Sequence, residues 1–526
     1  MADAEVQTRS QPRKPTWKDL IDNRRVLAWC LVIYILPINF GFEINVTGNL
    51  IAVPAFLDRF GVETADGSLE IKATDQQLLN AATTVGLFVS AFATGFLSDK
   101  LGRRNVVLAA CVISIAGIFV QAWSTSIAML FGGKIISTFG YGLGHSLGPV
   151  YVAELAPPIL RGTMLSLVNT MIVIGQWTCS LGVYAASFRK GDSAWRVPLL
   201  VQLIPPAVLF IIALPFLPES PSLLIMRGKR EAAAKALRIF NGPRYNVEEA
   251  ITTLELTIQH EHELLEQKSS YLDCFTSPNG RRTLIICMVY IAQQFIGVNF
   301  IAGYLAYYFQ LAGVDNALGI AQAAYAIQLF GNICSWPLID RFGRRPLIVH
   351  ATILMTALLL VIGGISTPKQ TPASLKATVA LMTIWGFLYQ ASLGPAAYSV
   401  GGETASPRVR QKTYSINIMT ATAVSCLVLQ VMPYLLNKDE ANLGGKICFV
   451  FFAPSVLMCV YLYYCFPEMK GRNYLELEEM FQERLPARKF KDYVCAANIE
   501  LAEVMNTKSA VIEQVEVIET EAERKE

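Results

Sequence analysis

The sequence predicts an all-α membrane protein in which twelve transmembrane helices form two pseudo-symmetric six-helix halves. Hydrophobic residues make up 53% of the 526-residue chain and charged residues 16%, whereas a typical soluble domain carries about 25% charged residues. Apolar runs of about 20 residues recur along the chain, and each is long enough to cross a hydrocarbon core as a helix. Three motifs of the first half also return in the second half at nearly one offset.

The repeated motifs combine acidic residues with arginines. The stretch Ser98-Asp-Lys-Leu-Gly-Arg-Arg104 returns as Ile339-Asp-Arg-Phe-Gly-Arg-Arg345, 241 positions later. The other two repeats lie 249 positions apart: Glu154 and Arg161 with Glu403 and Arg410, and Pro218-Glu-Ser-Pro221 with Pro467-Glu-Met-Lys470. Three repeats in the same order indicate two homologous halves.

The apolar runs predict the helices in order. The first helix is expected at about 26–53, and an acidic loop at 54–77 suits the outer face. The second helix returns to the first arginine pair, the fourth ends near Glu154, and the fifth and sixth occupy about 163–187 and 197–217. Helices seven to twelve repeat this pattern to about Cys465.

Charge placement predicts the topology. Basic residues favour the cytosolic side of a membrane, and several precede the first apolar run, so we expect both termini in the cytosol. The expected segments are a cytosolic N-terminal tail (1–25), a six-helix half (26–221), a cytosolic helical linker (222–281), a second six-helix half (282–466) and a cytosolic C-terminal tail (467–526).

Composition also narrows the function. Nine of the eleven cysteines fall inside apolar runs, and none has the spacing of a zinc site. No nucleophile–base set, metal cluster or phosphate-binding loop stands out in the sequence. We therefore expect no enzymatic activity, no metal and no nucleic-acid partner.

Several short motifs lie at the ends of the apolar runs and inside them. They are the Gly-Arg-Arg loops, Pro218-Glu-Ser-Pro221, Gln293-Gln294-Phe-Ile-Gly297-Val-Asn299 and Pro467-Glu-Met-Lys-Gly-Arg472. These motifs resemble the sugar porter family of the major facilitator superfamily. A narrower set resembles fungal α-glucoside (maltose-type) permeases: Gly394-Pro395-Ala-Ala-Tyr398, Arg408-Val-Arg410-Gln-Lys412-Thr, Pro433-Tyr-Leu-Leu-Asn437, Gly444-Gly445-Lys446 and Pro486-Ala-Arg-Lys-Phe490.

In such a transporter, ion pairs at the cytosolic helix ends can form in one state and break in the other. A network of several pairs biases a two-state equilibrium more than one weak surface pair does. The predicted gating residues are Asp99, Arg103, Arg104, Glu154 and Arg161 in the first half, Asp340, Arg344, Arg345, Glu403 and Arg410 in the second, and the further acceptors Glu219 and Glu468. The alternative is that these arginines only signal topology.

Two charges inside apolar runs predict a coupling site. Glu43 in helix one and Lys134 in helix four lie at matched depth, so they should pair. The resemblance implies that they replace an aspartate and an arginine that proton symporters of the family carry there. We interpret Glu43 as the protonation site and Lys134 as its partner; a structural ion pair in a uniporter is the alternative. His145 is expected to pack between helices rather than to relay protons.

The resemblance also implies a sugar site made of neutral amides and an aromatic ring. The corresponding residues are Gln176, Gln293, Gln294, Asn299, Gln328 and Tyr398. Amides offer both donors and acceptors to hydroxyl groups. Gly297 permits a helix break between the amides, a feature of central sites in transporters. Hydrogen bonding between helices is the alternative role.

Together these features predict a monomer in the lipid bilayer, in the plasma membrane, that imports a sugar, most plausibly an α-glucoside such as maltose. Alternating access would couple the sugar to a proton, and no cofactor is expected besides that coupling ion. A facilitative uniporter, an exporter of a fungal secondary metabolite and a non-transporting sugar sensor are the alternatives.

Overall fold

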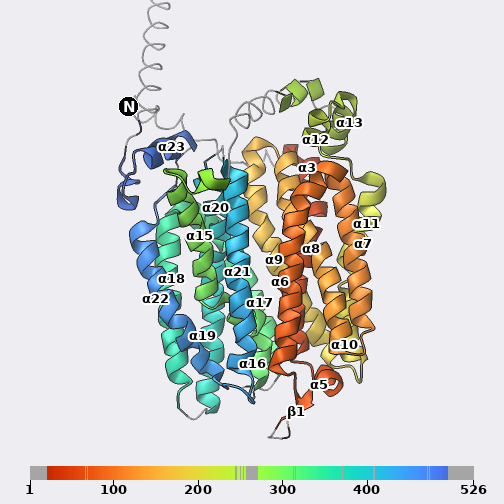
Figure 1. Ribbon diagram of the computed structural model, residues 1–526, viewed down its shortest axis with the longest axis vertical. Helices are drawn as coiled ribbons and strands as arrows, with labels where there is room; N and C mark the ends of the chain where they lie inside the picture. Colours follow the sequence, from red (N-terminus) through yellow and green to blue (C-terminus); the bar gives the residue numbers. More distant parts are fainter. Residues whose placement is uncertain are drawn as a thin grey trace, which may run out of the picture.

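The computed structural model describes residues 21–495 apart from 65–66, 68, 243–245, 249, 253, 256–270, 312, 314–315, 369–370, 407–408, 471, 473 and 494. Long helices run side by side through the molecule, with the first half coloured red to yellow and the second green to blue (Figure 1). Residues 1–20 and 496–526 of the predicted tails, and part of the predicted linker, lie outside the described residues.

The first half contains six crossings. In chain order they are α3 (Arg24–Ile33) with α4 (Ile35–Leu50), α6 (Ala73–Leu101), α7 (Arg103–Ala122), α8 (Ile127–Leu155), α9 (Pro158–Ser187), and α10 (Ser193–Val201) with α11 (Ile204–Phe216). Between the first two crossings lie α5 (Pro54–Phe60) and the strands β1 (Val62–Glu63) and β2 (Leu69–Glu70). The strands pair antiparallel, with Val62 opposite Glu70. We call this end of the bundle the hairpin end (bottom of Figure 1).

The second half repeats the six crossings. They are α15 (Asn279–Phe295) with the π-helix η2 (Asn299–Gly303) and α16 (Leu305–Leu311), α17 (Ala317–Phe342), α18 (Arg344–Ile365), α19 (Pro372–Ala391) with α20 (Leu393–Thr404), α21 (Arg410–Leu436), and α22 (Ile447–Cys465). Short 3₁₀ helices are η1 (Tyr271–Cys274), η4 (Gly444–Lys446) and η5 (Ala487–Lys489). These crossings confirm the predicted fold class of two six-helix halves.

At the opposite end, which we call the linker end, lie α12 (Pro221–Met226), α13 (Arg230–Asn241) and α23 (Tyr474–Gln482) (top of Figure 1). Among the described residues, nine crossings are long and apolar enough to span a membrane. The remaining three are α9 and the two crossings broken at Gly297 and Ser392. The fifth and sixth helices begin four to five residues before their predicted starts at 163 and 197, because Arg161 and Arg196 interrupt the apolar sequence near the helix starts.

Apolar packing joins the two halves at the hairpin end. One buried cluster contains Phe56 and Trp195 of the first half together with Tyr304 and Leu436 of the second. A separate cluster, which includes Tyr151, fills the linker end of the first half alone. The halves therefore share a continuous core at the hairpin end.

The segment after the last crossing packs against the linker end of α15. Arg282 is buried and forms an ion pair with Glu478 at 2.7 Å, while Arg281 Nη1 donates to the Leu485 carbonyl at 2.6 Å. The Phe481 and Phe490 rings meet edge to face, with centroids 5.1 Å apart. The apolar face of α23, with Leu477, Met480 and Phe481 buried, anchors this part of the predicted C-terminal tail.

Candidate transport site

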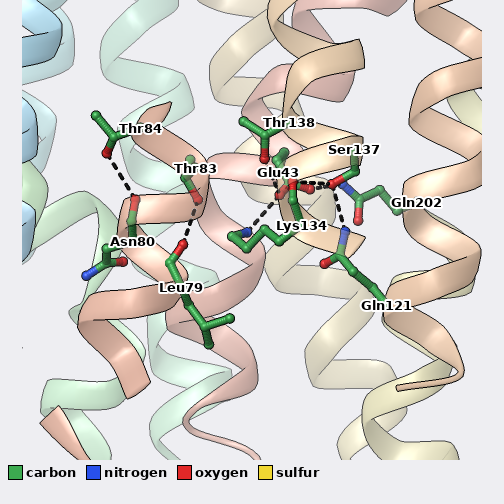
Figure 2. A network of polar contacts seen from close by, with 10 residues as sticks. All are labelled: Glu43, Leu79, Asn80, Thr83, Thr84, Gln121, Lys134, Ser137, Thr138 and Gln202. Atoms are coloured by element: carbon green, nitrogen blue, oxygen red, sulfur yellow. Dashed lines mark hydrogen bonds and ion pairs between the residues drawn. The ribbon is translucent and has the colours of Figure 1, made fainter. Parts of the chain in front are cut away.

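Glu43 and Lys134 form a buried ion pair inside the first half (Figure 2). Lys134 Nζ donates to Glu43 Oε1 at 2.7 Å, and the exposed fractions of the two side chains are 3% and 1%. Thr138 Oγ1 donates to the same oxygen at 3.3 Å. The predicted pairing of these two charges is confirmed, because α4 and α8 place them at the same depth.

A neutral amide completes the carboxylate's surroundings. Gln202 Nε2 donates to Glu43 Oε2 at 2.6 Å (Figure 2). Gln202 sits at the break between α10 and α11 and is fully buried. On the hairpin side, Gln121 Nε2 donates to Ser137 Oγ, whose hydroxyl bonds the Lys134 carbonyl. Sequence reasoning missed Gln202, because an uncharged residue in an apolar run gives no charge signal.

His145 lies on α8 about two helical turns past Thr138. Its ring stacks on Phe40 at 3.8 Å between centroids, with 12° between the ring planes. This stacking fits the expected helix-packing histidine.

The break predicted at Gly297 is confirmed, and the amides around it hydrogen-bond to protein groups. Gly297 has a φ of +92°, which favours glycine. Gln293 Nε2 donates to the Leu393 and Gly394 carbonyls at 3.1 and 3.3 Å, so it bridges to the break between α19 and α20. Asn299 Nδ2 spans Gly297 to reach Gln294 Oε1 at 2.8 Å and also donates to Ser425 Oγ.

The other three predicted substrate residues lie on separate helices. Gln176 of α9 is buried, and its carbonyl accepts from Asn45 Nδ2 at 3.1 Å. Gln328 of α17 is buried, and its Nε2 has no hydrogen-bond partner in the part of the chain that the structure describes. Tyr398 of α20 packs edge to face on Tyr290, with centroids 6.0 Å apart. Their substrate roles remain predictions.

Further polar groups join the two halves in the middle of the bundle. Tyr325 of α17 donates to Asn45 Oδ1 of α4 at 3.0 Å. Thr170 of α9 donates to Asn332 Oδ1 at 2.6 Å, and Asn332 Nδ2 in turn donates to Gln390 Oε1 at 3.2 Å. Sequence reasoning did not identify these residues, because their contacts depend on how the halves dock.

Several buried polar atoms in this interior lack a partner among the described residues. They include both amide atoms of Gln322, Nε2 of Gln328 and the indole nitrogens of Trp177 and Trp385. A buried donor or acceptor without a partner costs about 1–3 kcal/mol. A ligand with many hydroxyl groups would satisfy such atoms.

At the hairpin end, polar contacts fasten α6 and β2 to the second half. Asn437 is the centre: its Oδ1 accepts from Gln76 Nε2 at 3.0 Å and from the Tyr307 hydroxyl at 2.9 Å, and its Nδ2 donates to the Ile71 carbonyl. One turn further along α6, Asn80 Nδ2 donates to the Tyr304 hydroxyl at 2.6 Å. We call these six residues the hairpin-end latch.

At the linker end, the predicted gating residues of the first half meet around α7. Arg103 Nη2 contacts Glu154 Oε1 at 3.2 Å. Glu219 Oε1 accepts from the backbone amides of Arg103 and Arg104 at 2.8 and 3.3 Å. Arg104 Nη2 donates to the Leu214 carbonyl at 2.6 Å.

The second half repeats this arrangement around α18. Glu468 accepts from the backbone amides of Arg344 and Arg345, each at 3.1 Å, and Arg345 Nη2 donates to the Tyr463 carbonyl at 2.9 Å. Glu219 and Glu468 thus accept hydrogen bonds from helix N-termini, where free amides favour an anion. Their gating role remains a prediction. The side chains of Asp99, Arg161, Asp340, Glu403 and Arg410 lie outside the described part of the structure.

Comparison with known proteins identifies the family. Residues 29–481 match the family described as sugar (and other) transporter. The general alpha-glucoside permease of Saccharomyces cerevisiae is 29% identical over 496 residues, which cover 92% of this chain and 80% of the permease. The maltose permease MAL31 of the same yeast is 26% identical over 520 residues, 96% of this chain and 84% of that permease.

The fold is also similar to a solved transporter. The xylose transporter XylE from E. coli, in a partially occluded inward-open conformation, superposes with a TM-score of 0.70. It is 21% identical and covers 86% of this chain and 100% of its own. The predicted resemblance is confirmed, and the relatives are permeases rather than enzymes. This chain is an integral, multi-pass membrane protein that belongs to the sugar (and other) transporter family of the major facilitator superfamily.

Proposed function

We propose that this protein imports an α-glucoside such as maltose together with a proton. The observation that carries the proposal is the buried Glu43–Lys134 pair, with Gln202 on the second carboxylate oxygen. Carboxylates buried inside a membrane helix mark proton relays and substrate pathways. The pair lies in the half that also supplies Asn45, Thr170 and Gln176 to the boundary between the halves.

Coupling follows from competition for the carboxylate. The Lys134 ammonium group and a proton compete for the negative charge of Glu43, so the carboxylate forms either the ion pair or the neutral acid. Protonation of Glu43 removes the charge that holds the Lys134 ammonium group, so α4 and α8 are released from one another. Because α4 carries Asn45, whose side chain contacts both Gln176 and Tyr325, a shift of α4 reaches the interface between the halves.

Alternating access requires each end to open in turn. The hairpin-end latch and the shared apolar cluster hold that end closed here. Sugar and proton would leave at the linker end, which we assign to the cytosol. A membrane potential of 100 mV contributes about 2.3 kcal/mol for each charge moved inward.

The substrate class is supported by the relatives and by the interior. Two yeast proteins similar to this chain are named as permeases, one for α-glucosides and one for maltose. The partnerless amide atoms of Gln322 and Gln328 and the indole nitrogen of Trp385 suit a ligand rich in hydroxyl groups. The Trp385 and Tyr389 rings of α19 stack with their centroids 5.5 Å apart and offer an apolar face.

The proposal is tested in yeast that lack their own sugar permeases. Addition of maltose to weakly buffered cells that express this chain should make the medium alkaline, and empty-vector cells should not respond. Glu43→Gln should abolish maltose accumulation but keep exchange of labelled maltose across the membrane. Accumulation that still depends on pH in Glu43→Gln would contradict the role of Glu43. Maltose uptake without alkalinisation would indicate a uniporter.

A further inference from the structure

A small cavity lies beside the Glu43 network. It has about 10 Å³ of space for a water-sized sphere and lies between α4, α7, α8 and α11. The lining residues include Asn39, Ser114, Tyr141 and Pro206, all of them buried. About this much space holds a single water molecule.

The cavity lies on the linker side of Glu43. Asn39 precedes Glu43 by one helical turn on α4, which begins toward the linker end. Tyr141 follows Lys134 by two turns on α8, which runs toward that end. Pro206 follows Gln202 by one turn on α11, which runs in the same direction.

Two polar atoms that line the cavity lack a hydrogen-bond partner among the described residues. They are Asn39 Oδ1 and the Tyr141 hydroxyl, and each residue is only 3% exposed. The Tyr141 hydroxyl lies close to the Gln202 amide without reaching hydrogen-bond geometry. A bound water typically makes about three hydrogen bonds to such groups, and Asn39 and Tyr141 supply two of them.

We propose that this cavity is a hydration site through which Glu43 exchanges its proton with the linker end, and that Tyr141 passes the proton into it. The inference rests on the proton-coupled function proposed above. The described titratable groups that face Glu43 are Lys134 and Tyr141 of α8 and Cys179 of α9. Of these three, Tyr141 lines the cavity.

The transfer conserves protons and leaves Tyr141 unchanged. The O–H bond of protonated Glu43 breaks, and its proton forms a new bond to the Tyr141 oxygen. The original hydroxyl proton of Tyr141 passes at the same time to the water, which gives its excess proton to solvent when the linker end opens. Glu43 is then a carboxylate again and pairs with Lys134. Asn39 positions the water by offering it its amide oxygen.

The test uses the full chain in proteoliposomes. Uptake of labelled maltose driven by a pH gradient is compared with maltose exchange, which needs no net proton movement. For Tyr141→Phe and for the isosteric Asn39→Leu, the ratio of driven uptake to exchange should fall about tenfold, because a positioned proton-transfer group contributes at least that much. Tyr184→Phe, at a half-buried tyrosine near the hairpin end of α9, should leave the ratio unchanged.

Two further readouts separate a relay from a structural role. Replacement of H₂O by D₂O should slow driven uptake more than exchange in the wild type, and Tyr141→Phe should change that isotope effect. A high-resolution cryo-electron microscopy map, which needs no substrate, should show a water in the cavity of the wild type and none in Asn39→Leu.

The outcomes distinguish the two proposals. A wild type that couples maltose to protons, with Tyr141→Phe and Asn39→Leu both unaffected, would overturn the relay alone. A dry cavity in the wild-type map would also overturn it. A wild type that exchanges maltose but ignores the pH gradient would overturn proton coupling and the relay together.

Discussion

The Glu43–Lys134 pair keeps a negative and a positive group inside the first half, 2.7 Å apart. Each group depends on the other, because removal of one partner of a buried pair leaves an uncompensated charge. Lys134→Met should therefore reduce the free energy of unfolding by about 3–5 kcal/mol. The double variant Glu43→Gln/Lys134→Met removes both charges and should recover most of that loss. Thermal unfolding in detergent, followed by tryptophan fluorescence, measures both.

The matched control is Lys190→Met, at an exposed lysine after α9. It should leave the unfolding temperature unchanged, since an exposed side chain has little effect on stability. If the double variant were as unstable as Lys134→Met alone, the loss would come from packing and not from charge.

This residue pair shows how far single side chains are readable from sequence. Burial of a charge inside a membrane helix costs free energy, so Glu43 and Lys134 stood out as candidate site residues. Their matched depth in the membrane predicted the contact between them. Gln202 makes a contact of 2.6 Å to the same carboxylate but is uncharged. Gln202 reaches the carboxylate because the chain bends between α10 and α11, and no sequence motif predicted that bend.

At the scale of elements, the N-termini of α7 and α18 are built alike. Each follows a glycine with positive φ, +98° at Gly102 and +91° at Gly343, and each receives a glutamate on its first backbone amides. A Cβ on Gly102 would lie 2.2 Å from Glu219 Oε2. Absence of a side chain there lets the carboxylate approach the helix end.

Gly102→Ala should therefore displace Glu219 and strain the turn, at a cost of about 1–3 kcal/mol. We expect a lower unfolding temperature and slower maltose exchange. Gly95→Ala is the control, because Gly95 lies in α6, the helix that ends just before Gly102, with no atom within 4 Å of its Cβ position. Equal behaviour of the two variants would contradict a specific role for the Gly102 turn.

Helices were predicted well where a long, uninterrupted apolar run marks them and less well where the run is interrupted. The crossings broken at Gly297 and Ser392 and the α9 crossing are absent from the nine long apolar spans found among the described residues. Glycine at 297 revealed one break, but the break at Ser392 has no such mark. The Gln293 bridge between the two breaks follows only from their proximity.

At the scale of the molecule, the hairpin-end latch decides which end is closed. Asn437→Ala removes the acceptor of Gln76 and Tyr307 and the donor to the Ile71 carbonyl, all buried. Loss of these bonds should favour the state open at the hairpin end by about 1–3 kcal/mol. Spin labels at the exposed positions Lys72 and Glu440 should report a larger population of long distances.

Lys376→Ala, at an exposed lysine in α19, should leave this distance distribution unchanged. An Asn437→Ala distribution identical to the wild type would mean that apolar packing alone closes the hairpin end. Gln76 and Asn437 lie 361 positions apart, and no sequence pattern links them. The repeat predicted two halves, but their contacts depend on shape complementarity, which a one-dimensional pattern does not encode.

The packing of residues 474–495 under α15 has a practical consequence for labelling. A fluorescent protein fused directly after α22 would replace the segment that covers α15. Arg282 would lose Glu478, and both Arg281 and Arg282 would lose the aromatic rings that lie over them. The product would be prone to retention by cellular quality control, and its fluorescence would report misfolded chains. Fusion beyond residue 495 keeps this cover in place, so brightness would then measure the amount of folded transporter.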